Sequence, residues 1–116
     1  MAFMTEVQLK EMGFNSLGSN VLLSTKASFY NTSKISFGNN VRVDDFCILS
    51  AGENGISVGN YVHIAAYSSL IGAEHIKLED FSGLSSRVSI YSSSDDYSGN
   101  WMTNPMVPNE FTNVIS

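Results

Sequence analysis

Two stretches of the sequence decide the fold: ISFGNNVRV at residues 35–43 and ISVGNYVHI at residues 56–64. They share isoleucine, serine, glycine, asparagine and valine at matching positions. Within the first stretch, the large apolar residues Phe37 and Val43 are six positions apart. Apolar faces recur about every 3.6 residues in a helix and every second residue in a strand, so this period fits neither element. It predicts a repeat architecture.

The same spacing extends outward from these stretches in both directions. Three six-residue units and a short corner insertion would close one triangular coil, and successive coils would stack as parallel strands about 4.8 Å apart. We therefore expect an all-β solenoid of about four coils, whose three interior columns contain the first, second and third members of four apolar sets. With first members at positions 17, 37, 58 and 78, the sets are Leu17, Leu23, Phe29; Phe37, Val43, Leu49; Val58, Ile64, Leu70; and Leu78, Leu84, Ile90.

An antiparallel β-sandwich is the alternative, because it also contains many short strands separated by turns. A sandwich needs apolar alternation over five or six residues and tight hairpins. The constant register over four repeats favours the solenoid.

The residues before the repeats predict a cap over one end of the solenoid. Thr5 and Gln8 have the spacing of a capping box, and Gly13 supplies a left-handed stop. We expect a short helix over residues 6–12 that seals the core with Val7, Leu9, Met12 and Phe14. The predicted organisation is a capping helix at 1–16, a β-helix at 17–91 and an extended loop or C-terminal segment at 92–116.

Composition bounds the classes of function. The chain has 116 residues, enough for one domain, with 43% hydrophobic and 15% charged residues. No apolar run approaches the roughly 20 residues of a membrane helix, so no membrane partner is expected. Six Lys and Arg against 11 Asp and Glu argue against nucleic acid as a partner. Cys47, the single cysteine, predicts a small core residue, and the lack of an internal disulfide favours a cytoplasmic location.

These features resemble the hexapeptide-repeat acyltransferases, which fold as left-handed parallel β-helices, and in particular the sugar O- and N-acetyltransferase branch. The resemblance covers nearly the whole chain and rests on the two stretches above, the helical cap, and the segment 95–99 followed by Asn104-Pro105. It implies acetyl-CoA as co-substrate, a sugar or sugar-nucleotide acceptor, and a homotrimer with sites between neighbouring helices. Members normally continue with further coils, so we expect this chain to be the N-terminal part of such an enzyme, and whether it is active alone stays open.

The candidate catalytic residues are Asp95, Asp96 and His75. In the galactoside-type members a histidine of the loop after the repeats is the base, and the matching position here is Asp95. An aspartate at its ordinary pKa is a weak base for an alcohol, and either the adjacent Asp96 or an amine acceptor would ease that demand. Counting five positions from the third-column residues places His75 beside Asp95 in one corner column, as a possible oriented pair. The alternative is that both are solvated corner residues.

The candidate substrate-binding residues are His63, Tyr97, Asn100, Trp101 and Asn104. By the same count His63 lies at another corner, above Arg42, where it could contact a ligand or anion or simply bond to backbone. Aromatic side chains of the segment after the repeats could stack on a sugar ring or on adenine, and the asparagines could bond hydroxyls. Packing of Trp101 on the solenoid wall is the alternative.

No metal site is expected. Carbonic anhydrases on this fold use three histidines, whereas this chain has only His63 and His75, which are predicted to lie two faces apart.

The sequence therefore predicts an enzyme that transfers an acetyl group from acetyl-CoA to a sugar hydroxyl or amine. The alternative is a non-catalytic β-solenoid that trimerises or scaffolds a partner. The choice of sugar, and of O- or N-transfer, stays open.

Overall fold

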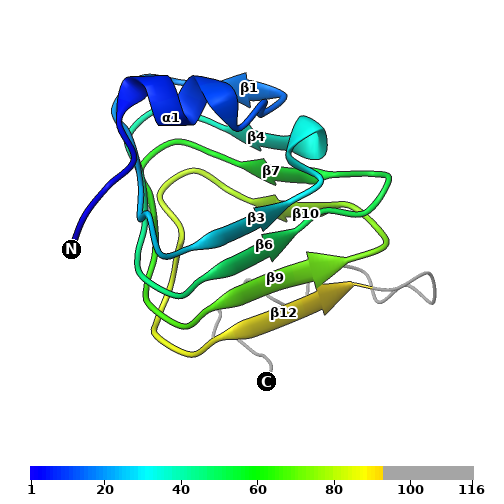
Figure 1. The fold of residues 1–116 in the computed structure, drawn as a ribbon. Coiled ribbons are helices and arrows are strands. Elements are labelled where there is room, and N and C mark those ends of the chain that lie inside the picture. The colour runs from blue at the N-terminus through cyan, green and yellow to red at the C-terminus, as the bar shows by residue number, and fades with distance from the viewer. Residues whose placement is uncertain (93–116) are drawn as a thin grey trace.

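The computed structural model of the chain describes residues 1–92. These residues form a three-sided solenoid of parallel strands, closed at one end by a helix (Figure 1). Each side is a sheet of four strands, one from each coil. Face 1 contains β1 (Ser16–Leu17), β4 (Ile35–Phe37), β7 (Ile56–Val58) and β10 (Ile76–Leu78). Face 2 contains β2 (Val21–Leu23), β5 (Val41–Val43), β8 (Val62–Ile64) and β11 (Gly83–Leu84). Face 3 contains β3 (Ser28–Tyr30), β6 (Ile48–Ser50), β9 (Ser69–Gly72) and β12 (Ser89–Ser92).

The three predicted columns are confirmed by the strand register. On face 1, Leu17 pairs with Phe37, Phe37 with Val58, and Val58 with Leu78. The second and third columns follow in the same way on faces 2 and 3. All these strand pairs are parallel, which excludes the antiparallel sandwich.

The coil is left-handed, as the family resemblance implies. In Figure 1 the coils descend from the cap, with β3, β6, β9 and β12 crossing the front from left to right. The strands β4, β7 and β10 return along the back from right to left. A chain that follows this path while descending traces a left-handed helix.

The interior is apolar and contains Cys47, which is fully buried as predicted. Side chains of the middle coils, such as Leu49 and Ile64, are also fully buried, whereas Leu17 and Leu84 in the outer coils are partly buried. This gradient is expected of a stack in which each coil is covered by its neighbours.

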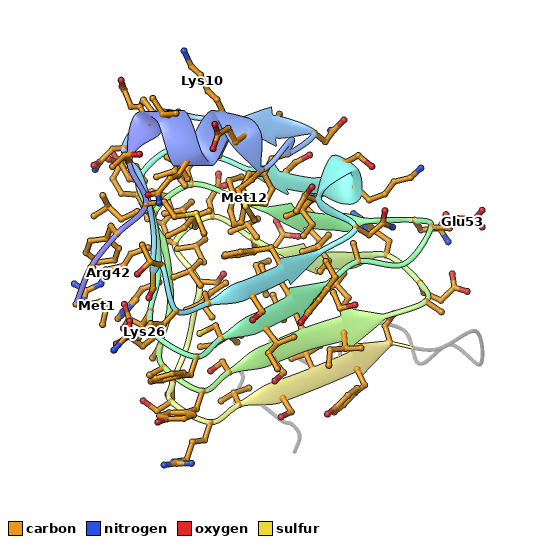
Figure 2. All side chains as sticks on the ribbon, viewed as in Figure 1. Met1, Lys10, Met12, Lys26, Arg42 and Glu53 are labelled. Carbon is orange, nitrogen blue, oxygen red and sulfur yellow. The ribbon has the colours of Figure 1, made fainter. Side chains whose placement is uncertain are left out.

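The predicted cap is the helix α1 (Glu6–Glu11), which the Thr5–Gln8 capping box begins. Gly13 follows it with φ of 72°, the predicted left-handed stop. Leu9, Met12 and Phe14 pack against the core, and Figure 2 shows Met12 pointing into the interior while Lys10 points away.

The prediction for Val7 was wrong, because its side chain is 64% exposed. Residues two positions apart lie on nearly opposite sides of a helix, so Val7 faces solvent when Leu9 faces the core.

Close contact between coils explains the glycine that follows the first apolar residue in three of the four repeats, at Gly18, Gly38 and Gly59. A Cβ on Gly38 would collide with the Asn60 side chain and with the backbone of Gly59 in the next coil. The Asn60 Oδ1 accepts a hydrogen bond from the Asn39 amide at 2.7 Å, and Asp80 accepts one from the Asn60 amide at 2.8 Å. The repeated glycine and asparagine thus join one coil to the next.

The corners carry stacked side chains on backbone in the left-handed region. Phe46 stacks on Tyr67 and Tyr61 on Phe81, each pair with ring centroids 5.1 Å apart. Left-handed backbone costs free energy for residues with a Cβ, and stacking between coils offsets part of that cost. Between residues 1 and 92 the non-glycine residues with positive φ are Asn20, Asn31, Asn40, Phe46, Tyr61, Tyr67, Phe81 and Arg87.

The connection from β3 in the first coil to β4 in the second coil contains the 3-10 helix η1 (Thr32–Lys34). Among the described residues, no helix has the length and apolarity required to cross a bilayer.

Candidate functional site

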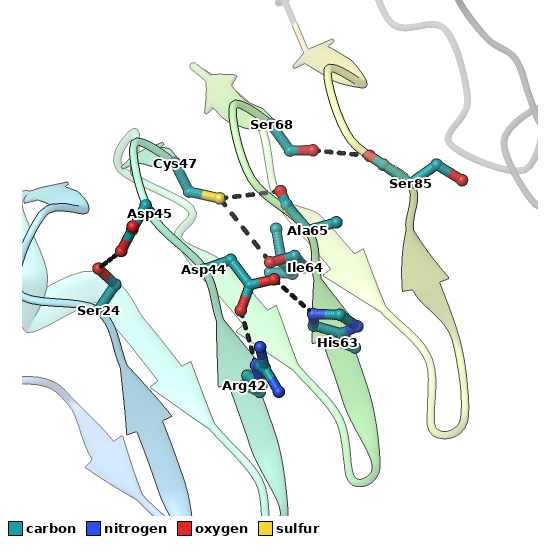
Figure 3. Close-up of polar contacts among 10 residues, drawn as sticks. All are labelled: Ser24, Arg42, Asp44, Asp45, Cys47, His63, Ile64, Ala65, Ser68 and Ser85. Carbon is teal, nitrogen blue, oxygen red and sulfur yellow. Dashed lines mark hydrogen bonds and ion pairs between the residues drawn. The ribbon is translucent and has the colours of Figure 1, made fainter. Parts of the chain in front are cut away.

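The outer surface of face 2 carries a linked polar cluster of Arg42, Asp44 and His63 (Figure 3). Arg42 and His63 point outward from β5 and β8 and are register partners. Asp44 follows β5 directly and is buried. Its Oδ1 accepts a hydrogen bond from Arg42 Nε at 2.7 Å, and its Oδ2 lies 2.8 Å from His63 Nε2. One buried carboxylate therefore orients two exposed basic side chains.

The electrostatics of Asp44 follow from these contacts. Burial by itself would raise the pKa of Asp44, but the hydrogen bonds and positive charges of His63 and Arg42 outweigh burial and hold that pKa below its ordinary value. Asp44 is therefore ionised at neutral pH. An ionised partner makes His63 Nε2 the protonated nitrogen and leaves Nδ1 available to a ligand.

The sequence-based position of His63 needs one correction. His63 lies above Arg42 as predicted, but in the middle of β8 (Val62–Ile64) and not at a corner. β8 continues to Ile64, the residue after His63, so the corner begins only after Ile64.

His75 lies in the connection between β9 and β10, on the side of face 1, and is exposed. Its Nε2 is 3.0 Å from the hydroxyl oxygen of Ser57, one coil closer to the cap. His63 and His75 thus occupy separate surfaces. Among residues 1–92, no three His, Cys, Asp or Glu side chains are grouped closely enough to hold a metal ion.

The turn after face 2 contains a second set of polar contacts between coils. Ser24 donates a hydrogen bond to Asp45 at 2.5 Å, and Ser68 donates one to the Ser85 carbonyl at 2.9 Å (Figure 3). The Cys47 thiol lies 3.1 Å from the Ala65 carbonyl, and burial raises the pKa of this thiol. A buried thiol with a raised pKa is a poor nucleophile, so Cys47 is structural.

Six predicted site residues lie outside the described part of the chain: Asp95, Asp96, Tyr97, Asn100, Trp101 and Asn104. The predicted pairing of His75 with Asp95 lies outside it too. Asp44 is the residue that the sequence reasoning missed. The spacing between the second and third coils places His63 in register with Arg42, so both side chains lie next to the carboxylate that follows β5. This spacing is the sequence signal that could have identified Asp44.

Comparison with known proteins gives close relatives. A curated Escherichia coli protein, dTDP-4-amino-4,6-dideoxy-D-glucose acyltransferase, is 60% identical over 116 residues, which is 100% of this chain and 60% of that protein. The chain resembles nucleotide-sugar acyltransferases. No protein-family model matches the chain.

Solved structures of AntD, an N-acyltransferase from Bacillus cereus, have the same fold. The complex of AntD with dTDP and 3-hydroxybutyryl-CoA is 51% identical with a TM-score of 0.74, over 92% of this chain and 56% of AntD. The complex of one AntD variant with dTDP-4-amino-4,6-dideoxyglucose and coenzyme A is 50% identical with the same TM-score, over 92% of this chain and 56% of AntD. These acyltransferases confirm the resemblance predicted from the repeats. The chain spans about 60% of the length of its curated relative.

Proposed function

We propose that this chain is the solenoid part of an enzyme that transfers an acyl group from acyl-CoA to the amine of a dTDP-linked amino sugar. The observation that carries the proposal is the 60% identity over all 116 residues to a dTDP-4-amino-4,6-dideoxy-D-glucose acyltransferase. AntD complexes that contain dTDP with 3-hydroxybutyryl-CoA, or the amino sugar nucleotide with coenzyme A, support both substrate classes. Acetyl-CoA, predicted from the sequence, is one acyl donor within this class.

The reaction demands little covalent chemistry from the protein. The acceptor nitrogen attacks the thioester carbonyl, the carbon–nitrogen bond forms, the carbon–sulfur bond breaks, and the nitrogen loses a proton while the thiolate gains one. The protein must align the two substrates and accept that proton. An amine is a better nucleophile than a hydroxyl, so it asks less of the base.

Asp95 is the residue we propose as proton acceptor, with Asp96 beside it and His75 as its partner. The AntD structures include variants at one serine and variants at an aspartate ten positions further along. Ser85 and Asp95, and likewise Ser86 and Asp96, have this same spacing here. The matching spacing supports a role for this pair of aspartates.

The remaining proposed contacts are to the substrates. His63 would contact a ligand from face 2. The segment after the repeats would supply stacking side chains and amides, from Tyr97, Asn100, Trp101 and Asn104.

Self-association as a homotrimer belongs to the proposal. It is supported by exposed apolar side chains on the outer surface of face 3, namely Tyr30, Ile48 and Tyr91. Sedimentation velocity measures the assembly, and a purely monomeric protein would contradict it.

We also propose a cytoplasmic location, which the reduced, buried Cys47 supports. Fractionation of cells that express the protein tests the location.

The enzymatic proposal is tested by following free coenzyme A released from acetyl-CoA and 3-hydroxybutyryl-CoA. dTDP-4-amino-4,6-dideoxyglucose is the acceptor, and the corresponding 4-hydroxy sugar nucleotide is the control. Thiol release that requires the amine supports the proposal. Absence of release with every donor would favour the alternative, a non-catalytic solenoid scaffold.

A further inference from the structure

The basic residues of this chain are few, and all of them lie within residues 1–92. The chain carries 11 Asp and Glu against 6 Lys and Arg, yet both proposed substrates carry several phosphate charges. A side-chain cation of this chain that meets a phosphate must be one of Lys10, Lys26, Lys34, Arg42, His63, His75, Lys77 and Arg87.

Arg42 and His63 differ from the others in their arrangement. They are the only two of these side chains that are register partners on adjacent strands within the described residues. Lys77 lies 3.8 Å from Glu79, which offsets its charge. Lys26 and Arg87 lie over different aromatic rings, on Phe46 and Tyr67 respectively.

Asp44 gives the pair a fixed geometry without occupying all of its donors. Arg42 bonds to the carboxylate through Nε, which leaves its two Nη groups available as a fork suited to a phosphate. The guanidinium also lies over the Phe3 ring, 5.6 Å from the ring centroid. Both side chains stay about half exposed, at 49% for Arg42 and 53% for His63, while Asp44 beneath them is at 9%.

Among residues 1–92, no side chain of the outward column stands next to His63 on the side away from Arg42. The next residue of the same outward column is Gly83, which pairs with His63 and has no side chain. Within the described part of the chain, β11 therefore leaves the imidazole open to a ligand.

We propose that Arg42 and His63 form a binding site for a phosphate group, with Asp44 as the residue that positions both. This inference rests on the proposed function for the source of the phosphate: either the diphosphate of the dTDP-sugar or the phosphates of coenzyme A. Arg42 provides the permanent positive charge and His63 adds a second when protonated.

The test is a titration of the full chain with inorganic diphosphate, followed by the NMR signals of the two histidine rings. We expect the His63 signals to shift and those of His75 to serve as the internal reference. Arg42→Gln should weaken diphosphate binding about tenfold, the size expected for loss of a charge-assisted hydrogen bond. The matched control Lys77→Gln removes the same charge from face 1 and should bind like the wild type. Unchanged His63 signals, or equal affinity in Arg42→Gln and the wild type, would overturn the proposal.

Repeating the titration with dTDP, coenzyme A and thymidine identifies which substrate supplies the bound phosphate. Loss of affinity for dTDP in Arg42→Gln and His63→Gln assigns the site to the nucleotide sugar, and loss for coenzyme A assigns it to the acyl donor. Thymidine lacks phosphate, so an equal loss for thymidine would contradict the inference. Failure of acyl transfer in the thiol assay would overturn the proposed function but leave the diphosphate titration as an independent measure of this site.

Discussion

At the residue scale, the buried carboxylate of Asp44 decides what face 2 can do. It turns two flexible basic side chains into one oriented pair, since each of its oxygens has a different partner. The folded-state pKa of Asp44 lies below the ordinary value of 3.8. Its contacts therefore stabilise the fold fully above about pH 3.8, and that contribution is lost as the pH falls through the lower, folded-state pKa.

Replacement of Asp44 tests this contribution to stability. Asp44→Asn should lower the free energy of unfolding by about 1 to 2 kcal/mol at neutral pH, because it removes hydrogen bonds between charged groups whose partners are partly exposed. The difference from the wild type should shrink below pH 3.8. Urea unfolding at pH 7 and pH 3 measures both values. Glu11→Gln, at an exposed helix position, is the control, and a difference as large at pH 3 as at pH 7 would contradict the assignment.

The role of Asp95 is tested by Asp95→Asn in the thiol-release assay. Loss of a general base typically slows a reaction by about 10² to 10⁴-fold. We therefore expect kcat of Asp95→Asn to be lower by at least about 10²-fold. Glu11→Gln again removes one distant carboxylate as a control. Unchanged turnover in Asp95→Asn would remove this residue from the proposed mechanism.

The sequence predicts which apolar residues are buried better than it predicts which polar residues are buried. The six-residue spacing predicts that Leu49 or Ile64 is buried, because one period fixes the side of the chain that faces inward. Asp44 follows a strand, where a carboxylate is usually solvated, and only the contacts across two coils show that it is buried. A polar residue in a corner depends on the residues of neighbouring coils, so its role needs the three-dimensional register.

At the scale of the element, the contact between successive coils sets which side chains each strand tolerates. The columns could be predicted because parallel, in-register stacking repeats one environment in every coil. The position of His63 within β8 could not, because a six-residue unit does not say where its strand ends and its corner begins.

Gly38 tests the close approach between coils. Gly38→Ala places a Cβ against the Asn60 side chain and the Gly59 backbone, so we expect a loss of about 1 to 3 kcal/mol in the free energy of unfolding. At Gly83 the nearest atom to an added Cβ is the His63 carbonyl oxygen at 3.1 Å, so Gly83→Ala should cost less. Chemical denaturation compares the two variants. Equal stability of Gly38→Ala and the wild type would show that the coils can move apart at no cost.

At the scale of the whole molecule, the cap matters because a stack of coils has two ends that its own repeats cannot cover. Phe14 closes one end by edge-to-face contact with Phe29 and Phe37, at centroid distances of 5.5 Å and 5.1 Å. Without the cap, these rings and the free edge of β1 would face solvent. Exposed strand edges and apolar ends promote association between molecules.

Substitutions at two positions of α1 can separate its role as a cover over the core from its tendency to form a helix. Leu9→Asp places a charge on the side that packs against the core and should destabilise the fold by about 2 to 3 kcal/mol through lost burial and the cost of desolvating a carboxylate. Val7→Asp makes the same change on the exposed side and should stay near the wild type. Thermal unfolding measures stability, and binding of a hydrophobic dye with light scattering measures exposure of the core and association. Equal behaviour of the two variants would mean that the helix lies on the solenoid without sealing it, and the end of the core would then have to be closed by other residues.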